Sequence, residues 1–540
     1  MYYRYFGGAA GLAIGILLAG CGGGGSSVQI STPAVSVTPV AYRLSDTADA
    51  AKPDYVKAMA TLSNGNVVTT LIQSDTILVD DATHSSTGVA HTLVASGSDV
   101  GVVVYDKTSG QALTRFSFGG SAPRVVPHGI AVDSADNFYI VGYAAVTNGG
   151  STTVNFGASD QTFTGGEVPF VAKYNASGQL QWAHVLQGSA GVSPTNCSGT
   201  NCDRAWDIAI NATGEVGVVG GFSGTLALPN SSTLTAVGGS DIFVLILNGS
   251  GSQLAAWSIG GPGDEAGFPG TTASPGGLGE MALVAQGTQW VVQGTFANST
   301  EFGGTGASSV QSPANGVRDV FVARYTHGGV LQDAVWAAGA IADVTGGLSA
   351  PGAMRGDSVG NLYLSLRFNP GGNSLTGCAT QAGEKLHTLS LNSAFGCRWI
   401  KRFDFMPGGI HRTVVDGSGE VFVAGWFLGS HNFPNQTLMA RSTRSDVFLA
   451  RLDGGTGAFR WGSGMVSTAT VAAANIPAGL ALDGVGNPWI GGQFFAATEF
   501  AQIGLGDNSK VLLPSYSGPI TGNSNDGFVA RYSRDIGTLR

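Results

Sequence analysis

The stretch "DVFVARY" (residues 319–325) recurs along the chain, and its clearest relatives are "DVFLARL" (446–452) and "DGFVARY" (526–532). Four weaker copies align with it: "DVGVVVY" (99–105), "VPFVAKY" (168–174), "DIFVLIL" (241–247) and "KLHTLSL" (385–391). Successive copies lie about 71 residues apart, and self-similarity at a fixed period is typical of a repeat architecture. The sequence therefore predicts seven copies of one structural unit.

The residues around each copy predict three further strands. Upstream stand two apolar runs joined by a polar turn, as in "GIAVDSADNFYIVG" (129–142) and "GLALDGVGNPWIGG" (479–492). Asp, Gly and Asn favour the geometry of such tight turns. Downstream comes a short strand with a recurring tryptophan: Trp182, Trp257, Trp336, Trp399 and Trp461. Four short strands repeated seven times, without helical periodicity, predict an all-β fold, a single seven-bladed β-propeller of four-stranded antiparallel blades.

These units resemble the SBBP-type β-propeller repeat of bacteria, whose pattern runs close to "GIAVDSSGNVYVTG". The resemblance covers residues 128–540 well and 54–127 weakly. It implies the fold more than a function, because most members of that family are exported or surface proteins of unknown role. The blades are expected at about 54–125, 126–200, 203–265, 276–345, 350–405, 408–470 and 475–540.

The two ends of the repeated region predict how the ring closes. The last copy stops at "GTLR" (537–540), just before its tryptophan position, while "PVAYRLS" (39–45) precedes the first inner strand. Residues near 36–45 are therefore expected to supply the outer strand of the seventh blade. Such a strand closes the ring and covers an edge that would otherwise be exposed.

The N-terminus predicts export and anchoring. The apolar run Phe6–Leu18 is too short to span a bilayer but suits a signal peptide. It leads into "LLAGC" (17–21), which resembles the lipobox of bacterial lipoproteins and implies acylation of Cys21. The expected domains are a lipoprotein signal peptide (1–20), a flexible tether (21–35) and the propeller (36–540). The alternative is a plain secretory signal with a chance cysteine.

The other four cysteines form two local pairs, Cys197 with Cys202 and Cys378 with Cys397. Because an exported compartment permits disulfides, both pairs are expected to be bonded. The alternative, a metal site, lacks the C-x2-C spacing of zinc motifs, so no metal is predicted. The same resemblance to lipoproteins places the chain in the bacterial cell envelope. Gly22 after the lipidated cysteine favours the outer membrane.

The composition excludes some function classes. The net charge is −9 and only 11% of residues are charged, with no basic cluster, so nucleic acid is not an expected partner. No nucleophile-elbow or phosphate-loop motif is present, and no cofactor is predicted. The repeated Asp at the start of "DVFVARY" is interpreted as a device that sets strand register. The recurring tryptophan is interpreted as packing against the next blade.

Candidate binding residues lie where the copies differ. The residues that open the seven inner strands are Lys57, His128, Trp206, Glu280, Gly352, His411 and Ala478, with the polar neighbours Arg204, Asp207, Arg355 and Arg412. Inner strands line the central channel of a propeller, so these side chains are expected to gather at one mouth of the channel as a polar funnel. The alternative is a solvated rim without a function.

The sequence thus predicts a monomeric, lipid-anchored envelope protein that binds or scaffolds a protein or glycan partner and is not an enzyme. The predicted channel-mouth residues are Lys57, His128, Arg204, Trp206, Glu280, Arg355, His411 and Arg412. A partner surface is also expected on the long loops at 143–167, 297–318 and 427–445. The alternatives are a lyase or hydrolase acting on an extracellular polymer at the channel mouth, and a purely structural surface component.

Overall fold

The computed structural model divides the chain into two units, and the larger one, Thr38–Arg540, contains every residue described below. The structure describes residues 40–46, 54–74, 76–80, 90–95, 99–120, 124–146, 150–188, 203–262, 265, 281–296, 299–303, 309–311, 318–341, 354–368, 377–378, 385–405, 408–440, 445–467, 475–494, 498–500, 511–513 and 526–538. This part of the chain contains no helix that is both long and apolar enough to cross a bilayer.

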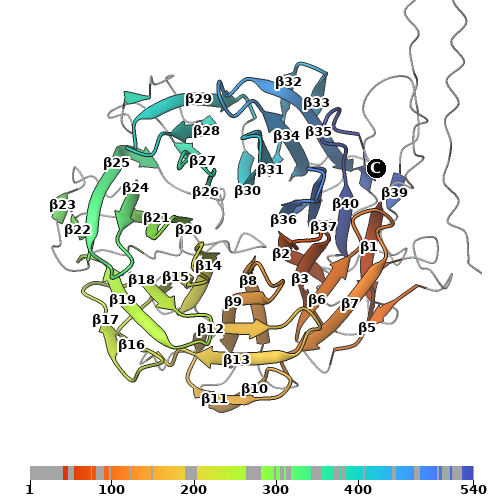
Figure 1. Cartoon of the computed structure of the whole chain (residues 1–540). Coiled ribbons are helices and arrows are strands. Elements are labelled where there is room, and N and C mark those ends of the chain that lie inside the picture. Colours follow the sequence, from red (N-terminus) through yellow and green to blue (C-terminus); the bar gives the residue numbers. More distant parts are fainter. Residues whose placement is uncertain are drawn as a thin grey trace, which may run out of the picture. The chain divides into compact units, whose positions relative to one another are not determined.

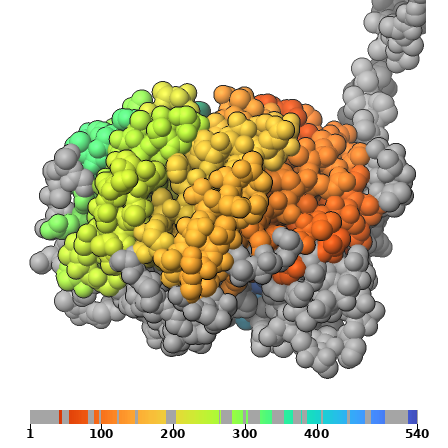
Figure 2. Space-filling view, turned by 90° about the horizontal axis from the view of Figure 1, so that it is seen from below, coloured from red at the N-terminus to blue at the C-terminus, as the bar shows by residue number. Residues whose placement is uncertain are grey.

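The larger unit is a ring of seven antiparallel blades, which confirms the predicted fold (Figure 1). Blade 1 contains β2 (Tyr55–Thr61), β3 (Val67–Gln73), β6 (Asp99–Tyr105) and β7 (Ala112–Phe118). Blade 2 contains β8 (Arg124–Val132), β9 (Phe138–Ala145), β12 (Glu167–Tyr174) and β13 (Leu180–Val185). Blade 3 contains β14 (Arg204–Ile210), β15 (Val216–Phe222), β18 (Asp241–Leu247) and β19 (Gln253–Ile259). Figure 2 shows these three blades side by side, in chain order from orange to green.

The remaining blades repeat the same order from the channel outward. Blade 4 contains β20 (Ala282–Gln286), β21 (Gln289–Phe296), β24 (Arg318–Tyr325) and β25 (Leu331–Ile341). Blade 5 contains β26 (Met354–Gly356), β27 (Leu362–Phe368), β28 (Lys385–Leu391) and β29 (Cys397–Phe403). Blade 6 contains β30 (Gly408–Val415), β31 (Val421–Phe427), β34 (Asp446–Leu452) and β35 (Phe459–Ser467). Blade 7 contains β36 (Ile476–Leu482), β37 (Pro488–Phe494), β40 (Asp526–Arg531) and β1 (Ala41–Asp46).

The N-terminal strand β1 closes the ring, as the sequence predicted. It pairs antiparallel with β40, from Ala41 opposite Ala530 to Leu44 opposite Gly527. Tyr42 of β1 takes the place of the recurring tryptophan, because its hydroxyl donates to the carbonyl oxygen of Gly110 in blade 1 at 2.7 Å. The seventh blade is therefore built from both ends of the propeller sequence.

The recurring tryptophans join each blade to the next. Three of the indole N–H groups donate to carbonyl oxygens in the following blade's turn between the third and fourth strands: Trp182 to Gly249 at 3.1 Å, Trp399 to Gly454 at 2.9 Å and Trp461 to Arg534 at 2.8 Å. The ring of Trp257 packs against Gly329 of the next blade's turn without this hydrogen bond. Trp336 departs from this pattern and is 38% exposed. The facing turn of blade 5 carries Phe395 at φ 61° where the other turns carry glycine, and this ring is buried instead.

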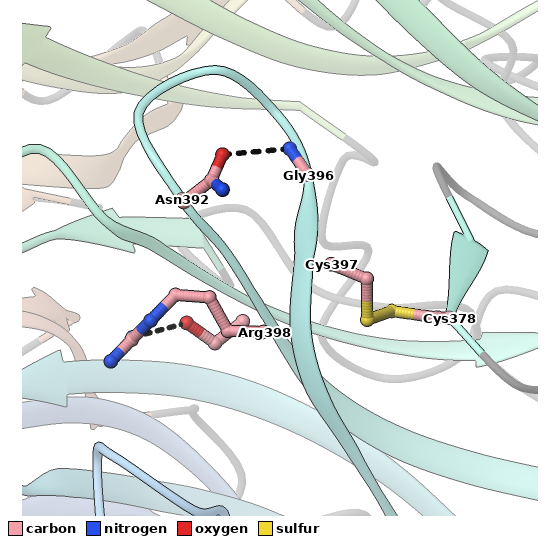
Figure 3. The surroundings of a disulfide bond; sticks show 6 residues. Cys378, Asn392, Gly396, Cys397 and Arg398 are labelled. Atoms are coloured by element: carbon pink, nitrogen blue, oxygen red, sulfur yellow. Dashed lines mark hydrogen bonds between the residues drawn. A yellow bond between two sulfur atoms is a disulfide. The ribbon is translucent and has the colours of Figure 1, made fainter.

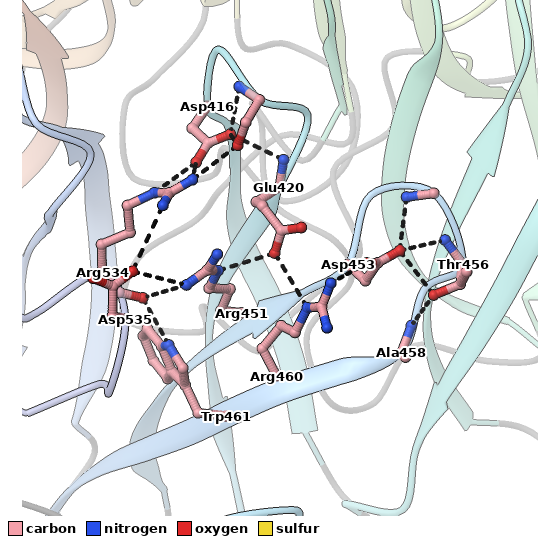
Figure 4. Close-up of polar contacts among 12 residues, drawn as sticks. Asp416, Glu420, Arg451, Asp453, Thr456, Ala458, Arg460, Trp461, Arg534 and Asp535 are labelled. Atoms are coloured by element: carbon pink, nitrogen blue, oxygen red, sulfur yellow. Dashed lines mark hydrogen bonds and ion pairs between the residues drawn. The ribbon is translucent and has the colours of Figure 1, made fainter. Parts of the chain in front are cut away.

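The basic residue of "DVFVARY" reaches the same turns. Its side chain donates to carbonyl oxygens of the next blade: Lys173 to Gly249 at 2.9 Å, Arg451 to Arg534 at 2.9 Å, and Arg531 to Thr108 across the ring closure at 3.0 Å. Figure 4 shows this contact between blades 6 and 7, where Arg534 also pairs with Asp416 at 2.6 Å. The repeated stretch is therefore a scaffold element that fastens neighbouring blades together.

The repeated aspartate fixes neighbouring segments within a blade or between blades. Asp99 accepts the backbone N–H of Gly120 at 2.8 Å, on the segment that leads to the next blade. Asp526, in the last copy, forms an ion pair with Arg43 of β1 at 3.4 Å. These contacts account for the aspartate by structure alone, without a ligand.

The long loop between the second and third strands of a blade forms a hairpin that returns to the preceding blade. These hairpins are β4–β5 (Ile77–Leu78, Thr92–Leu93), β10–β11 (Ser151–Asn155, Asp160–Thr164), β16–β17 (Thr225–Ala227, Thr233–Thr235), β22–β23 (Ser299–Glu301, Ser309–Gln311), β32–β33 (Ser430–Phe433, Gln436–Met439) and β38–β39 (Thr498–Phe500, Val511–Leu513). β4 pairs with β1, and β38 pairs with β35. Single bridges link Gly119 to Asn155 and Gly260 to Glu301. The loops predicted as a partner surface thus also hold neighbouring blades together.

The disulfide between Cys378 and Cys397 confirms one predicted pair (Figure 3). Cys397 opens β29, the outer strand of blade 5, and Asn392 shapes the preceding turn by accepting the N–H of Gly396 at 2.8 Å. The bond ties the loop around Cys378 to the outside of this blade. Cys197 and Cys202 lie outside the described residues.

Candidate functional site

Five inner strands carry a β-bulge at the same position, next to the central channel. The extra residues are Lys57 in β2, His128 in β8, Trp206 in β14, His411 in β30 and Ala478 in β36. A bulge redirects a side chain and locally increases the twist of its strand. These are five of the seven positions that the sequence alignment singled out. Glu280 and Gly352, the other two, lie outside the described residues.

The two histidines connect neighbouring blades. Nδ1 of His128 lies 2.9 Å from the carbonyl oxygen of Ala205, and Nδ1 of His411 lies 2.9 Å from that of Pro477. A carbonyl can only accept, so each ring carries its hydrogen on Nδ1. Burial lowers the pKa of His411 to about 3 and holds the pKa of His128 well below its usual value. Both rings are therefore neutral at pH 7. His128 also stacks on Trp206, with ring centroids 4.1 Å apart.

Arg412 crosses the centre of the ring. Its guanidinium donates to the carbonyl oxygens of Lys57 at 2.9 Å and His128 at 3.4 Å, so it joins blade 6 to blades 1 and 2. Arg355 pairs with Asp207 at 3.2 Å and thereby joins blade 5 to blade 3. The expected open funnel is therefore partly filled. The bulge side chains and Arg412 are buried.

A second ion pair joins Arg204, the first residue of β14, to Glu167, the first residue of β12. Arg204 donates to both carboxylate oxygens of Glu167, with Nη2 and Oε1 2.9 Å apart. Its guanidinium also lies over the ring of Tyr143, 4.4 Å from the centroid. Bidentate pairing and stacking together fix the position of this cation.

Lys57 has no counter-charge in the described part of the chain. Its side chain is 3% exposed, and no hydrogen bond or ion pair joins Nζ to another described residue. The nearest ring is Tyr55, whose centroid lies 5.6 Å from Nζ. Burial, together with the positive charges of Arg412, Arg124 and Arg204, lowers the pKa of Lys57 to about 7.

Arg124 extends this group of cations to the surface. It opens β8, is exposed, and forms no ion pair with a described carboxylate. Burial raises the pKa of Tyr55 to about 12, and the nearby charge of Arg124 partly opposes that shift. Arg124, Glu167 and Tyr143 were not predicted from the sequence, because they lie outside the positions next to the bulge at which the copies differ. Alternate side chains of a strand point to the same face, so the positions two and four residues before each bulge residue are also candidates. In β8 the second of these positions is Arg124.

The charges of this region define what it can do. The cations are Lys57, Arg124, Arg204, Arg355 and Arg412, and the carboxylates Glu167 and Asp207 are both paired with arginines. Such a mouth attracts anions. An amine that is unprotonated near pH 7 can also act as a base or a nucleophile. Among the described residues, no group of three or more His, Cys, Asp or Glu side chains is placed to hold a metal ion.

Comparisons with known proteins do not assign the chain to a family. No protein-family model matches the chain, and no curated protein matches it. The quinohemoprotein alcohol dehydrogenase from Comamonas testosteroni is 11% identical, with 90% of this chain and 78% of that chain covered and a TM-score of 0.37. A PL25 ulvan lyase is 11% identical, with 82% and 92% covered and a TM-score of 0.35. The gluconolactonase XC5397 from Xanthomonas campestris is 14% identical, with 73% and 95% covered and a TM-score of 0.28.

The prediction that the chain is not an enzyme is wrong. The solved structures just named include a dehydrogenase, a lyase and a lactonase, and these matches contradict it. The prediction relied on missing sequence motifs, but a propeller assembles its channel from residues far apart in the chain. Lys57 illustrates the point, since its environment comes from blades 2, 3 and 6 as well as its own.

Proposed function

We propose that the chain is a lipid-anchored protein of the bacterial cell envelope whose propeller binds an anionic ligand at the channel mouth. The site centres on Lys57 and Arg124, and the charges of Arg204 and Arg412 also act on Lys57. The ligand class is a glycan or a protein segment that presents carboxylate or sulfate groups. The observation that carries this proposal is the buried Lys57, which has three cations around it and no carboxylate partner in the described part of the chain.

Electrostatics favours an anion over a neutral ligand here. A buried ammonium group without a partner is costly, and its pKa falls until it loses the proton. A bound carboxylate would supply the missing counter-charge and allow Lys57 to take up a proton. Arg204 and Arg355 already have carboxylate partners, so Lys57 and Arg124 are the cations of this region that remain for a bound anion.

The "LLAGC" motif supports the anchor. If Cys21 is acylated, the mature protein begins at that residue, and several acyl chains hold it stably in a membrane. Mass spectrometry of the purified membrane fraction should give a mature N-terminus at Cys21 that carries acyl chains. An unmodified protein cleaved elsewhere and recovered in the soluble fraction would contradict the anchor.

Isothermal titration with trigalacturonate, a carboxylated oligosaccharide, tests the binding site. We expect the wild type to bind it at pH 6.5 and not to bind neutral maltotriose. Lys57→Met should weaken binding at least tenfold, because it removes the charge but keeps the length and apolar part of the side chain.

Lys401→Met serves as the matched control, because Lys401 lies on β29, the outer strand of blade 5, away from the inner strands. Its Nζ lies over the ring of Phe459 in blade 6. This variant should bind like the wild type. Equal binding of trigalacturonate by the wild type and Lys57→Met, or no binding by the wild type, would overturn the proposed site.

A further inference from the structure

We propose that Lys57 captures a small oxo acid covalently, by forming an imine with the ligand's carbonyl carbon at the channel mouth. This inference rests on the proposed function, because it requires the same cationic site to hold the ligand's carboxylate. It adds a chemical class to that site: a carboxylate with an aldehyde or ketone next to it.

The position of Lys57 is the first argument. The residue is the inserted one in the bulge of β2, between Val56 and Ala58, so its side chain is directed by a fixed backbone irregularity. Carboxylates that would compete for the amine are occupied elsewhere, Glu167 by Arg204 and Asp207 by Arg355. No described hydrogen-bond acceptor holds Nζ, so its lone pair is not tied up in a structural contact.

The surroundings of the amine are the second argument. A lysine becomes nucleophilic when burial and neighbouring cations remove its proton near neutral pH, and that is the usual activation of imine-forming lysines. Lys57 is buried, and Arg412, Arg124 and Arg204 all act on it. Its pKa of about 7 means that roughly half of the amine is unprotonated at pH 7.

The placement of the arginines is the third argument. Arg124 is exposed at the start of β8, while Lys57 is 3% exposed. An oxo acid entering from the mouth would meet Arg124 first, and the positive charge of Arg124, which acts on Lys57, would draw its carboxylate toward the amine. The burial of Lys57 limits the ligand to a small molecule or to the end of a longer one.

The chemistry balances without an oxidant or a metal. The lone pair of Nζ attacks the carbonyl carbon, and a proton moves from nitrogen to the former carbonyl oxygen to give a carbinolamine. The second proton of the nitrogen is transferred to that oxygen, which leaves as water, and a C=N bond remains. One amine and one carbonyl are consumed, and one imine and one water are formed.

Reductive trapping tests the inference. Wild-type protein is incubated at pH 7 with glyoxylate and sodium cyanoborohydride, which converts an imine into a stable secondary amine, and the modified lysines are mapped by mass spectrometry. We expect Lys57 to be modified at least ten times faster than Lys107, a partly exposed lysine in a surface turn. Arg124→Met should slow trapping at Lys57 by glyoxylate but not by formaldehyde, which has no carboxylate.

A second variant separates this inference from the proposed function. Lys57→Arg keeps a positive charge but cannot form an imine, so it should still bind trigalacturonate and should show no trapping at position 57. If trigalacturonate binding depends on Lys57 while glyoxylate labels Lys57 no faster than Lys107, the imine inference fails and the binding site stands. If trigalacturonate does not bind and Lys57 is not labelled, both fail.

Discussion

Deletion of residues 28–46 is expected to abolish the cooperative thermal unfolding of the propeller and to leave a protein that aggregates. Val40, Tyr42 and Leu44 are at most 2% exposed, and burying side chains of this size contributes roughly 1.5–3 kcal/mol each. Their sum approaches the net stability of an ordinary domain, which is about 5–15 kcal/mol. The deletion therefore removes most of the free energy of unfolding that keeps the ring folded.

The deletion also breaks polar contacts across the closure. Tyr42 no longer donates to Gly110, Asp526 loses Arg43, and the N–H of Arg531 loses the carbonyl oxygen of Val40 at 2.9 Å. β40 then presents an unpaired edge, which is a template for association between copies.

Differential scanning calorimetry and size-exclusion chromatography measure this effect. Deletion of residues 22–36 is the matched control, because it shortens the chain before the first described residue and keeps β1. The control should melt like the wild type. A monomeric 28–46 deletion variant with the wild-type melting temperature would show that β1 does not close the ring in solution.

Lys57→Met is expected to stabilise the ligand-free protein at pH 7, and the gain should shrink as the pH rises toward 10. The pKa of Lys57 is about 7 in the folded protein, against 10.5 for a lysine side chain in water. Between these values the unfolded chain binds a proton that the folded chain lacks. Stability therefore rises with pH in this window, by up to about 1.4 kcal/mol per unit from this group. Methionine removes that dependence.

Urea unfolding of both proteins between pH 7 and 10 measures the difference. The acid side supplies an internal control, because the pKa of His411 is lowered to about 3 from 6.5. Both proteins should lose stability together as the pH falls from 6.5 toward 3, since the unfolded chain then gains a proton that the folded histidine lacks. A constant stability gap between wild type and Lys57→Met from pH 7 to 10 would mean that Lys57 is charged in the free protein.

Much of the scaffold could be predicted because it repeats. The spacing of "DVFVARY" predicts the number of blades, and the missing tryptophan of the last copy predicts the role of residues near 36–45. The bulge residues could be aligned for the same reason. The contact of Arg412 with the carbonyl oxygens of Lys57 and His128 could not be predicted, because it joins residues of non-adjacent blades that are 355 and 284 positions apart in the sequence.

The hairpins were missed for a related reason. The long loops between second and third strands vary in sequence from blade to blade, so they looked available for a partner. In the structure they return to the preceding blade, through pairs such as Gly119 with Asn155. The channel is partly filled because long side chains such as Arg412 and Arg355 reach other blades. A local sequence pattern does not indicate which blades they reach.

The central claim is that Lys57 is a buried amine that becomes fully charged when an anion binds beside it. The most direct measurement is the pKa of Lys57 by NMR of protein with 13C-labelled lysine, assigned by comparison with Lys57→Met, in the absence and presence of saturating trigalacturonate. The structure predicts a pKa near 7 in the free protein. It also predicts an upward shift of at least one unit on binding, because a neighbouring carboxylate favours the protonated amine. A pKa near 10.5 in the free protein, or no shift in the presence of the ligand, would contradict the account.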